Sequence, residues 1–154
     1  IKNHLQGKPA GIKMKVNHIT DVDMVSRIYD AVSAGVKVEA LVRGNCSLVD
    51  SEEFDDRLKV VGIIDRYLEH SRIFIFQNGG EPLYFMGSAD WMPRNLVSRI
   101  EVVTPVYDKE IQQELLRIVN YGLMDNVNGR LLMGSQENDL PFRSQEQLYN
   151  DYCK

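Results

Sequence analysis

The pattern that most constrains the fold is a strand, a helix and a second strand within residues 10–42. Apolar and polar residues alternate through AGIKMKVN, as in a strand, and apolar residues at helical spacing follow from about Val22 until Gly35. The segment VKVEALV then predicts a second strand. Because the crossover in such a unit is long, the two strands are predicted to be parallel, with ligands bound at their carboxyl ends. Those ends carry Asn17 and Arg43.

The middle of the chain predicts further strands and one long helix. LKVVGIID is typical of a third strand, and RIFIFQN and LYFMGS are typical of a hairpin around GGEP. Both arms of this hairpin are apolar on both faces, which predicts that they lie in the middle of a covered sheet. SRIEVVTPV predicts another strand, and Asp108 is expected to cap a helix whose apolar stripe, over residues 111–124, belongs to the core.

These elements predict an α/β fold with a single layered domain over residues 1–130. From about Asn126, polar residues, Gly and Pro interrupt every period, so residues 131–154 are predicted to form an irregular or partly helical tail, or a strap for a neighbouring domain. The acidic run DSEEFDDR is predicted to be a solvated loop.

Composition limits the partners of the chain. With 154 residues, a net charge of −4 and a pI near 5.4, it has no global basic field, so we expect no nucleic-acid partner and a local cluster wherever a polyanion binds. No apolar run approaches a membrane span and no signal peptide is visible, which predicts a soluble intracellular protein. Cys46 and Cys153 lie in no metal-binding motif and are expected to be reduced thiols. The first residue is not Met, so we expect a piece of a longer protein.

Five polar residues around the predicted hairpin could carry chemistry: His70, Arg72, Ser88, Asp90 and Asn95. The hairpin brings the start of its first arm beside the end of its second arm, so His70 and Ser88 are expected to be neighbours. Arg72 is two residues from His70 and is expected on the same side, where its cation suits a phosphate beside an acid/base imidazole. A structural or surface role for His70 stays open at this point.

The pattern His-x-Lys/Arg followed by Gly-Ser-x-Asn/Asp resembles a half-site of the phospholipase D superfamily, read here as His70, Arg72 and residues 87–90. The longer strings VRGNCSL, DRYLEHSRIFIFQNGGEP and GSADWMPRNL are similar to the carboxyl-terminal catalytic domain of the histidine-dependent bacterial polyphosphate kinases. This likeness extends from about Gly7 to Arg130. It implies a phospholipase-D-like mixed sheet flanked by helices.

The resemblance also implies an activity, the reversible transfer of the ATP terminal phosphate to a polyphosphate chain. The family uses Mg²⁺ and a phosphohistidine in a preceding domain, so the Mg²⁺ ligands are expected upstream, no metal ligand is expected in this chain, and the chain alone is expected to be inactive. ATP or ADP, inorganic polyphosphate and the upstream domains are the implied partners, in a homo-oligomeric full-length protein. A cytoplasmic location is expected, with membrane association of the full-length enzyme left open.

Site residues follow from the resemblance and from charge. The resemblance implies that His70 is a second family His, which contacts nucleotide phosphates or transfers a proton, and that Arg43 binds the nucleotide phosphates. Arg72, Arg94 and Ser88 are expected to bind phosphate beside them, because phosphoryl transfer needs positive charge around the transferred group. Lys13 or Lys15 could add to that charge.

Three departures from the phospholipase D pattern bear on mechanism. Gln77 stands where the superfamily has Asp, Arg72 replaces Lys, and Asp90 stands where Asn is common. They favour a supporting, non-nucleophilic role for His70. A phospholipase-D-like phosphodiesterase that pairs two copies of His70 in a homodimer and a non-catalytic polyphosphate or nucleotide-binding module remain as alternatives. The other two histidines, His4 and His18, are expected to be exposed and without function, and Trp91 is expected to pack under the hairpin.

Overall fold

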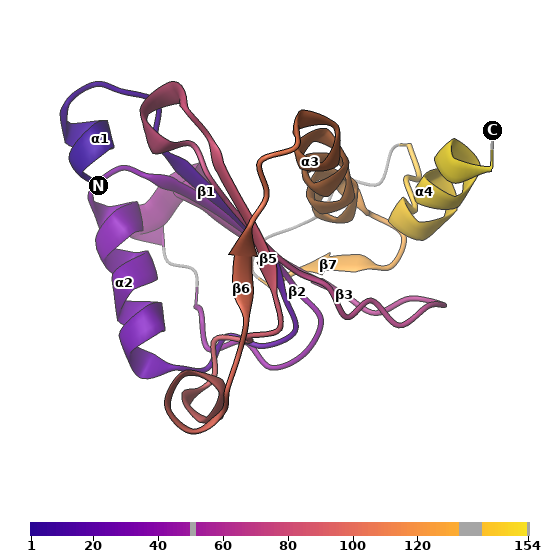
Figure 1. Cartoon of the computed structure of the whole chain (residues 1–154), viewed down its shortest axis with the longest axis horizontal. Helices are drawn as coiled ribbons and strands as arrows, with labels where there is room; N and C mark the ends of the chain where they lie inside the picture. Colours follow the sequence, from indigo (N-terminus) through magenta and orange to yellow (C-terminus); the bar gives the residue numbers. More distant parts are fainter. Residues whose placement is uncertain (50–51, 133–139, 154) are drawn as a thin grey trace.

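The computed structural model describes residues 1–49, 52–132 and 140–153. Its seven-stranded sheet has the order β6-β5-β4-β1-β2-β3-β7 and carries helices on both faces (Figure 1). The strands are β1 (Gly11–Val16), β2 (Lys37–Val42), β3 (Leu58–Ile63), β4 (Arg72–Phe76), β5 (Leu83–Gly87), β6 (Val103–Pro105) and β7 (Gly129–Leu131). The helices are α1 (Lys2–Leu5), α2 (Val22–Ser33), α3 (Lys109–Met124) and α4 (Ser144–Tyr152), with short turns η1 (Glu52–Arg57), η2 (Asn78–Gly80) and η3 (Arg94–Ser98). The predicted α/β mixed sheet flanked by helices is confirmed.

The unit β1–α2–β2 forms as the sequence predicted. Strand β1 pairs parallel with β2, and β2 pairs parallel with β3. The Asp21 side chain caps α2 by accepting a hydrogen bond from the Met24 backbone N–H at 3.0 Å. Gly35 follows the helix with φ of 97°, a left-handed conformation that favours glycine. The carboxyl ends of the two strands therefore lie side by side.

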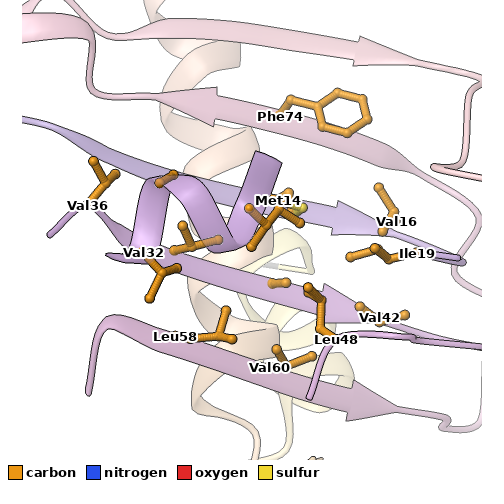
Figure 2. Close-up of a cluster of buried hydrophobic side chains, with 14 residues drawn as sticks. Met14, Val16, Ile19, Val32, Val36, Val42, Leu48, Leu58, Val60 and Phe74 are labelled. Carbon is orange, nitrogen blue, oxygen red and sulfur yellow. The ribbon is translucent and has the colours of Figure 1, made fainter. Parts of the chain in front are cut away.

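The sheet has an apolar core on each face. Figure 2 shows the first core, in which α2 residues such as Val32 cover Met14, Val42 and Phe74 of the sheet. On the other face, α3 packs through Leu115, Val119 and Leu123. The expectation that the whole stripe of α3 is core was wrong at its ends, because Ile111 is 48% exposed and Met124 is 56% exposed. Their neighbours Gln112 and Leu123 are buried, so Ile111 and Met124 lie on the side of the helix that faces away from the sheet.

Strands β4 and β5 form the predicted antiparallel hairpin, with Arg72 paired to Gly87. Strand β4 is covered on both faces, as expected, because it also pairs with β1 in the centre of the sheet. The same expectation was wrong for β5, where Leu83 is 44% exposed and Met86 is 39% exposed. Beyond β5 lies only β6, which forms three residues of the strand predicted from SRIEVVTPV and is itself exposed. Trp91 packs as expected, with its ring stacked on Phe74 at 5.5 Å.

The acidic run forms a short helical turn where a loop was predicted, although Glu53 and Asp56 are exposed to solvent as expected. In the described part of this run, residues 52–57 form η1, in which Phe54 stacks on Tyr29 at 5.5 Å. The Arg57 guanidinium donates to the Phe54 carbonyl at 3.0 Å and closes the turn. The first two residues of the run lie outside the described residues. One apolar ring thus fastens an otherwise charged segment to the core.

The segment after Asn126 contains a strand that its sequence did not predict and a helix within the part expected to be irregular or partly helical. Strand β7 pairs antiparallel with β3, and α4 packs on α3, where the Tyr121 hydroxyl donates to Asp151 at 2.8 Å. Residues 133–139 lie outside the described residues, and the division at residue 130 stays a prediction. Among the described ranges, no helix is both long and apolar enough to cross a membrane.

Candidate active site

Four of the five polar residues predicted around the hairpin, His70, Arg72, Ser88 and Asp90, meet in one pocket of about 480 Å³ at an edge of the sheet. The fifth, Asn95, is buried and does not line it. Asn17 and Arg43 follow the parallel strands β1 and β2, while His70 precedes the antiparallel strand β4, so all three reach the same edge. The lining consists of Asn17, His18, Arg43, His70, Arg72, Ser88, Asp90, Arg94, Arg99 and Glu101. The five residues predicted for phosphate binding and catalysis are all among them.

Asp90 organises the floor of the pocket. Its carboxylate is 3% exposed and accepts hydrogen bonds from the backbone N–H groups of Asn17 at 2.7 Å and His18 at 3.3 Å. It also accepts from the Arg72 Nη2 at 2.8 Å and Nε at 3.3 Å. Burial alone would raise the pKa of Asp90, but the hydrogen bonds from Arg72 and Asn17 outweigh it and hold the pKa below its usual value. The group is therefore a carboxylate, and it fixes the ends of β1 and β5 together.

Arg72 lines the pocket and also forms an ion pair with Asp90. Besides its two contacts with Asp90, its Nη1 donates to the His70 carbonyl at 2.8 Å. Its side chain is only 10% exposed. Arg72 thus orients the backbone at His70, and its role in phosphate binding stays a prediction.

His70 is exposed and faces Arg43. The Arg43 Nη2 lies 3.3 Å from the His70 Nδ1, and its Nε donates to the Asn17 Oδ1 at 2.9 Å. Since a guanidinium can only donate, Nδ1 must accept and the ring proton is assigned to Nε2. The Arg72 cation, with partial burial and Arg43, lowers the pKa of His70 below its ordinary value. His70 is therefore a neutral hydrogen-bond donor near pH 7.

Ser88 is held by a carboxylate that the sequence did not indicate. Its hydroxyl donates to the Glu101 Oε2 and accepts from the Val102 N–H at 3.1 Å. Glu101 also accepts from the Asn95 Nδ2 at 2.6 Å, and these two hydrogen bonds lower the pKa of its carboxyl. Because the hydroxyl hydrogen of Ser88 is already donated, binding of phosphate by Ser88 stays a prediction.

Arg94 and Arg99 come from η3 and the segment after it. The Arg99 Nε lies 3.6 Å from the Glu101 Oε1. Arg94 is exposed and has no hydrogen-bond or ion-pair partner among the residues that the structure describes. In the pocket, four arginines oppose two carboxylates, which leaves an excess of two positive charges from these groups. An acidic chain thus contains a locally basic cavity.

His18 was wrongly expected to be exposed. It is half-buried and lines the pocket, and its Nδ1 accepts from the Asn45 backbone N–H at 2.9 Å. The Nε2 proton is therefore available to a ligand. Its position directly after Asn17, at the carboxyl end of β1, was the signal that could have identified it. His4 is exposed, as expected.

The lysines of β1 lie on the opposite side of the sheet from α2 and do not line this pocket. The Lys13 ammonium pairs with Glu39 at 2.8 Å, and Lys15 pairs with Glu69 at 3.2 Å. Neither adds to the charge of the cavity wall.

The carboxylates of the pocket do not suit Mg²⁺. Asp90 is paired with Arg72, and Glu101 is bonded to Ser88 and Asn95. Within residues 1–49, 52–132 and 140–153, no group of three or more His, Cys, Asp or Glu side chains could hold a metal ion. We derive no step through a metal in this chain.

Comparison with known proteins assigns the family. Residues 1–150 match the family model described as "Polyphosphate kinase C-terminal domain 2". The chain belongs to the polyphosphate kinase C-terminal domain family. It is 45% identical to polyphosphate kinase of Escherichia coli over 133 residues, which is 86% of this chain and 19% of that protein. It is 40% identical to polyphosphate kinase of Vibrio vulnificus over 162 aligned positions, which cover all of this chain and 23% of that protein.

Solved structures agree with this assignment. The crystal structure of polyphosphate kinase from Porphyromonas gingivalis is similar at a TM-score of 0.90 and 34% identity, over 99% of this chain and 24% of that chain. Nuc, a phospholipase D family member from Salmonella typhimurium, has a TM-score of 0.61 at 14% identity, over 80% of this chain and 82% of that chain. The second likeness shows a phospholipase-D-like fold alone. This domain thus spans about a fifth to a quarter of the length of the polyphosphate kinases named here.

Proposed function

We propose that this domain supplies one wall of a phosphoryl-transfer site that moves the terminal phosphate of ATP to and from polyphosphate. The phosphohistidine would lie in an upstream domain, as would the ligands of any Mg²⁺, and the assembled protein would be a cytoplasmic homo-oligomer. The domain would bind phosphate groups of nucleotide and polymer without forming the covalent intermediate itself. The observation that carries the proposal is the convergence of Arg43, Arg94 and Arg99 with His70 on one basic cavity.

The chemistry of phosphoryl transfer fits such a cavity. The transferred group spreads negative charge over its equatorial oxygens, so a protein contributes mainly alignment and positive charge. The guanidinium groups of Arg94 and Arg99, which are exposed, and of Arg43, which is half-buried at the end of β2, can contact successive phosphates of a chain, and each contact of this kind is charge-assisted. The family assignment supports polyphosphate and ATP as the polyanions.

His70 would act as a neutral donor. The nucleophilic His of a phosphodiesterase needs a free Nε2 with Nδ1–H held by an acceptor, whereas the Arg43 guanidinium at Nδ1 imposes the opposite arrangement. Gln77, in the position of the superfamily Asp, follows the far end of β4 from His70 and cannot reverse this. The Nε2–H of His70 would stabilise a phosphate oxygen as charge develops there.

The test is binding of tripolyphosphate to the 154-residue chain, measured by titration calorimetry at fixed ionic strength. Arg94→Ala is expected to weaken binding about tenfold, since one charge-assisted hydrogen bond contributes about 1.5–3 kcal/mol before losses to exposure. The matched control is Arg27→Ala, which removes the same charge from an exposed position on α2 and should change affinity by less than about twofold.

Equal affinities of Arg94→Ala, Arg27→Ala and the unsubstituted chain would refute the proposed pocket. Cleavage of a phosphodiester substrate by the isolated chain, abolished by His70→Ala, would instead support the homodimeric hydrolase. Tight binding by the chain, combined with normal polymer synthesis by a full-length His70→Ala protein, would identify a non-catalytic binding module.

A further inference from the structure

The segment that carries His70 is not held by the sheet. Residues 64–71 connect β3 to β4 without strand pairing, and apolar side chains such as Ile64 and Leu68 are largely exposed. A catalytic side chain on such a segment needs contacts from elsewhere to keep its position. Such contacts are made by the residues on either side of His70.

Lys15 holds both neighbours of His70. Its ammonium lies 3.2 Å from the Glu69 Oε2 and donates to the Ser71 Oγ at 2.9 Å. The residue is 4% exposed, and burial lowers the pKa of its ammonium although Glu69 opposes the shift. A buried lysine is retained as a charge only beside a partner, so Lys15 and Glu69 depend on each other.

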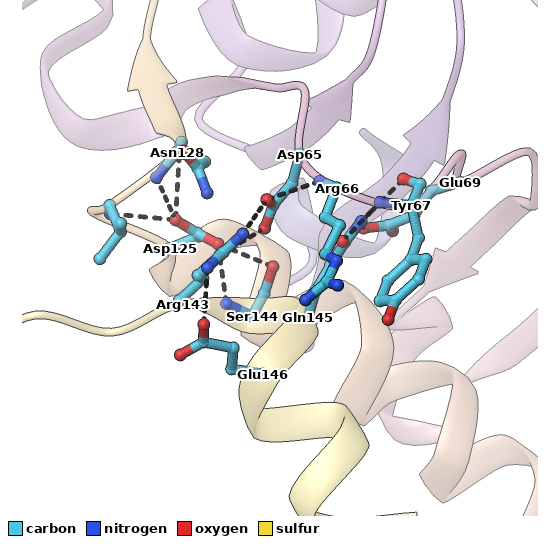
Figure 3. Close-up of polar contacts among 12 residues, drawn as sticks. Asp65, Arg66, Tyr67, Glu69, Asp125, Asn128, Arg143, Ser144, Gln145 and Glu146 are labelled. Carbon is cyan, nitrogen blue, oxygen red and sulfur yellow. Dashed lines mark hydrogen bonds and ion pairs between the residues drawn. The ribbon is translucent and has the colours of Figure 1, made fainter.

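Gln145, in the first turn of α4, holds the same segment from the other side (Figure 3). Its Nε2 donates to the Tyr67 carbonyl at 2.9 Å and to the Glu69 Oε1 at 2.8 Å, while its Oε1 accepts from the Tyr67 N–H at 2.9 Å. The two oxygens of Glu69 are thus bonded to two elements that are 130 residues apart in sequence. Gln145 itself is 9% exposed.

Helix α4 is fastened firmly enough to serve as an anchor. Asp125, which follows α3, accepts hydrogen bonds from the Ser144 N–H at 2.7 Å and hydroxyl at 2.8 Å. Arg143 forms a bidentate ion pair with Asp65, with contacts of 2.7 and 3.0 Å (Figure 3). The N-terminal end of α4 is therefore fixed both to the residue after α3 and to Asp65 by buried or partly buried polar pairs.

We propose that Glu69 is a positioning residue that keeps His70 beside Arg43 and Arg72, and that Lys15 and Gln145 hold its carboxylate from the two sides. The C-terminal helix would thereby set the geometry of the catalytic edge. The expected effect on phosphate binding rests on the proposed function of the pocket, whereas the contacts of Glu69 can be tested without it.

The experiment replaces the Gln145 amide with an apolar chain of the same length, Gln145→Met. Its control is Gln147→Met, on the same helix, where the amide contacts Asp151 at 3.2 Å and not residues 64–71. A second control is Val32→Ala, which removes core packing between α2 and the opposite face of the sheet. It lowers the free energy of unfolding without touching residues 64–71. The readouts are the His70 pKa from imidazole NMR shifts, exchange of the Tyr67 amide, and tripolyphosphate affinity.

In Gln145→Met we expect the Tyr67 amide to exchange its hydrogen faster, because its acceptor is removed. We also expect the His70 pKa to rise toward its ordinary value, because the imidazole moves away from Arg72 and Arg43. Tripolyphosphate affinity is expected to fall about threefold to tenfold. Neither control should move the pKa. A loss of Tyr67 protection with unchanged His70 pKa would overturn the proposal, as would an equal shift in Val32→Ala. A shifted pKa in a chain that never binds tripolyphosphate would keep the positioning role and refute the proposed function.

Discussion

Removal of the Asp90 carboxylate is the perturbation with the largest expected effect on this domain. Asp90→Ala leaves the Arg72 guanidinium, whose side chain is 10% exposed, without its charge partner. It also leaves the backbone N–H groups of Asn17 and His18 without their acceptor. Loss of one partner of a buried ion pair costs about 3–5 kcal/mol, because the remaining charge stays desolvated. A domain of this size has a free energy of unfolding of about 5–15 kcal/mol, so the variant should fold with a much reduced margin.

The assay is urea unfolding followed by circular dichroism, with the free energy of unfolding compared across a double-mutant cycle. Arg72→Met removes the cation but leaves Asp90 its contacts with Asn17 and His18, so it should cost less than Asp90→Ala. The double variant Arg72→Met/Asp90→Ala should cost less than the sum of the single variants by more than about 1 kcal/mol. A cost below about 1 kcal/mol for Asp90→Ala would refute the reasoning, since it would mean that Arg72 turns freely to solvent.

Two further perturbations test the neighbourhood of the site. The Arg143 guanidinium lowers the pKa of Asp65 from 3.8 to about 2, so the ion pair stabilises the fold fully above pH 4 and less as the pH falls through 2. Acid unfolding should show a loss of about 1–2 kcal/mol over that window, and Asp65→Asn should remove this pH dependence. A Cβ at Gly44 would collide with the His18 ring, so Gly44→Ala should displace the imidazole from the Asn45 N–H and destabilise the fold by about 1–3 kcal/mol, measured by thermal unfolding. An unchanged melting temperature for that variant would show that the ring is not fixed.

The central strands could be predicted because their signals are local and agree with the tertiary contacts. The alternation at β1 matches its position between β2 and β4, and Asp108 caps α3 through the Glu110 N–H at 2.9 Å and the Ile111 N–H at 3.1 Å. The burial of a strand could not be predicted where it depends on the neighbouring strand. The two arms of the hairpin have similar sequences, yet only β4 is covered, because β5 faces the short strand β6.

The sequence predicted which residues meet at the site but not which hydrogen-bond and ion-pair partners they have. Strand ends and hairpin register were enough to bring Arg43, His70 and Ser88 to one edge. The partners of these residues could not be read from the sequence, because Glu101 reaches Ser88 only through the path of η3 and the following loop. A partly helical tail was expected, but the position of the C-terminal helix could not be predicted, for a related reason. It is held mainly by side-chain hydrogen bonds of Gln145 and Arg143, which follow no apolar period.

The hydrogen bonds and ion pairs of Asp90 and Glu101 would explain how an acidic domain could bind a polyanion at one place. The whole chain has a net charge of −4 and the pocket has an excess of two positive charges, so the rest of the chain carries −6. Under the proposed function, a polyphosphate approaching any other surface would be repelled on average, whereas the cavity would attract it over about a Debye length. Asp90 and Glu101 would not cancel this attraction, because each is already bonded to groups inside the wall. Carboxylates at the centre of the site would therefore position its polar groups while the exposed Arg94 contacts the ligand.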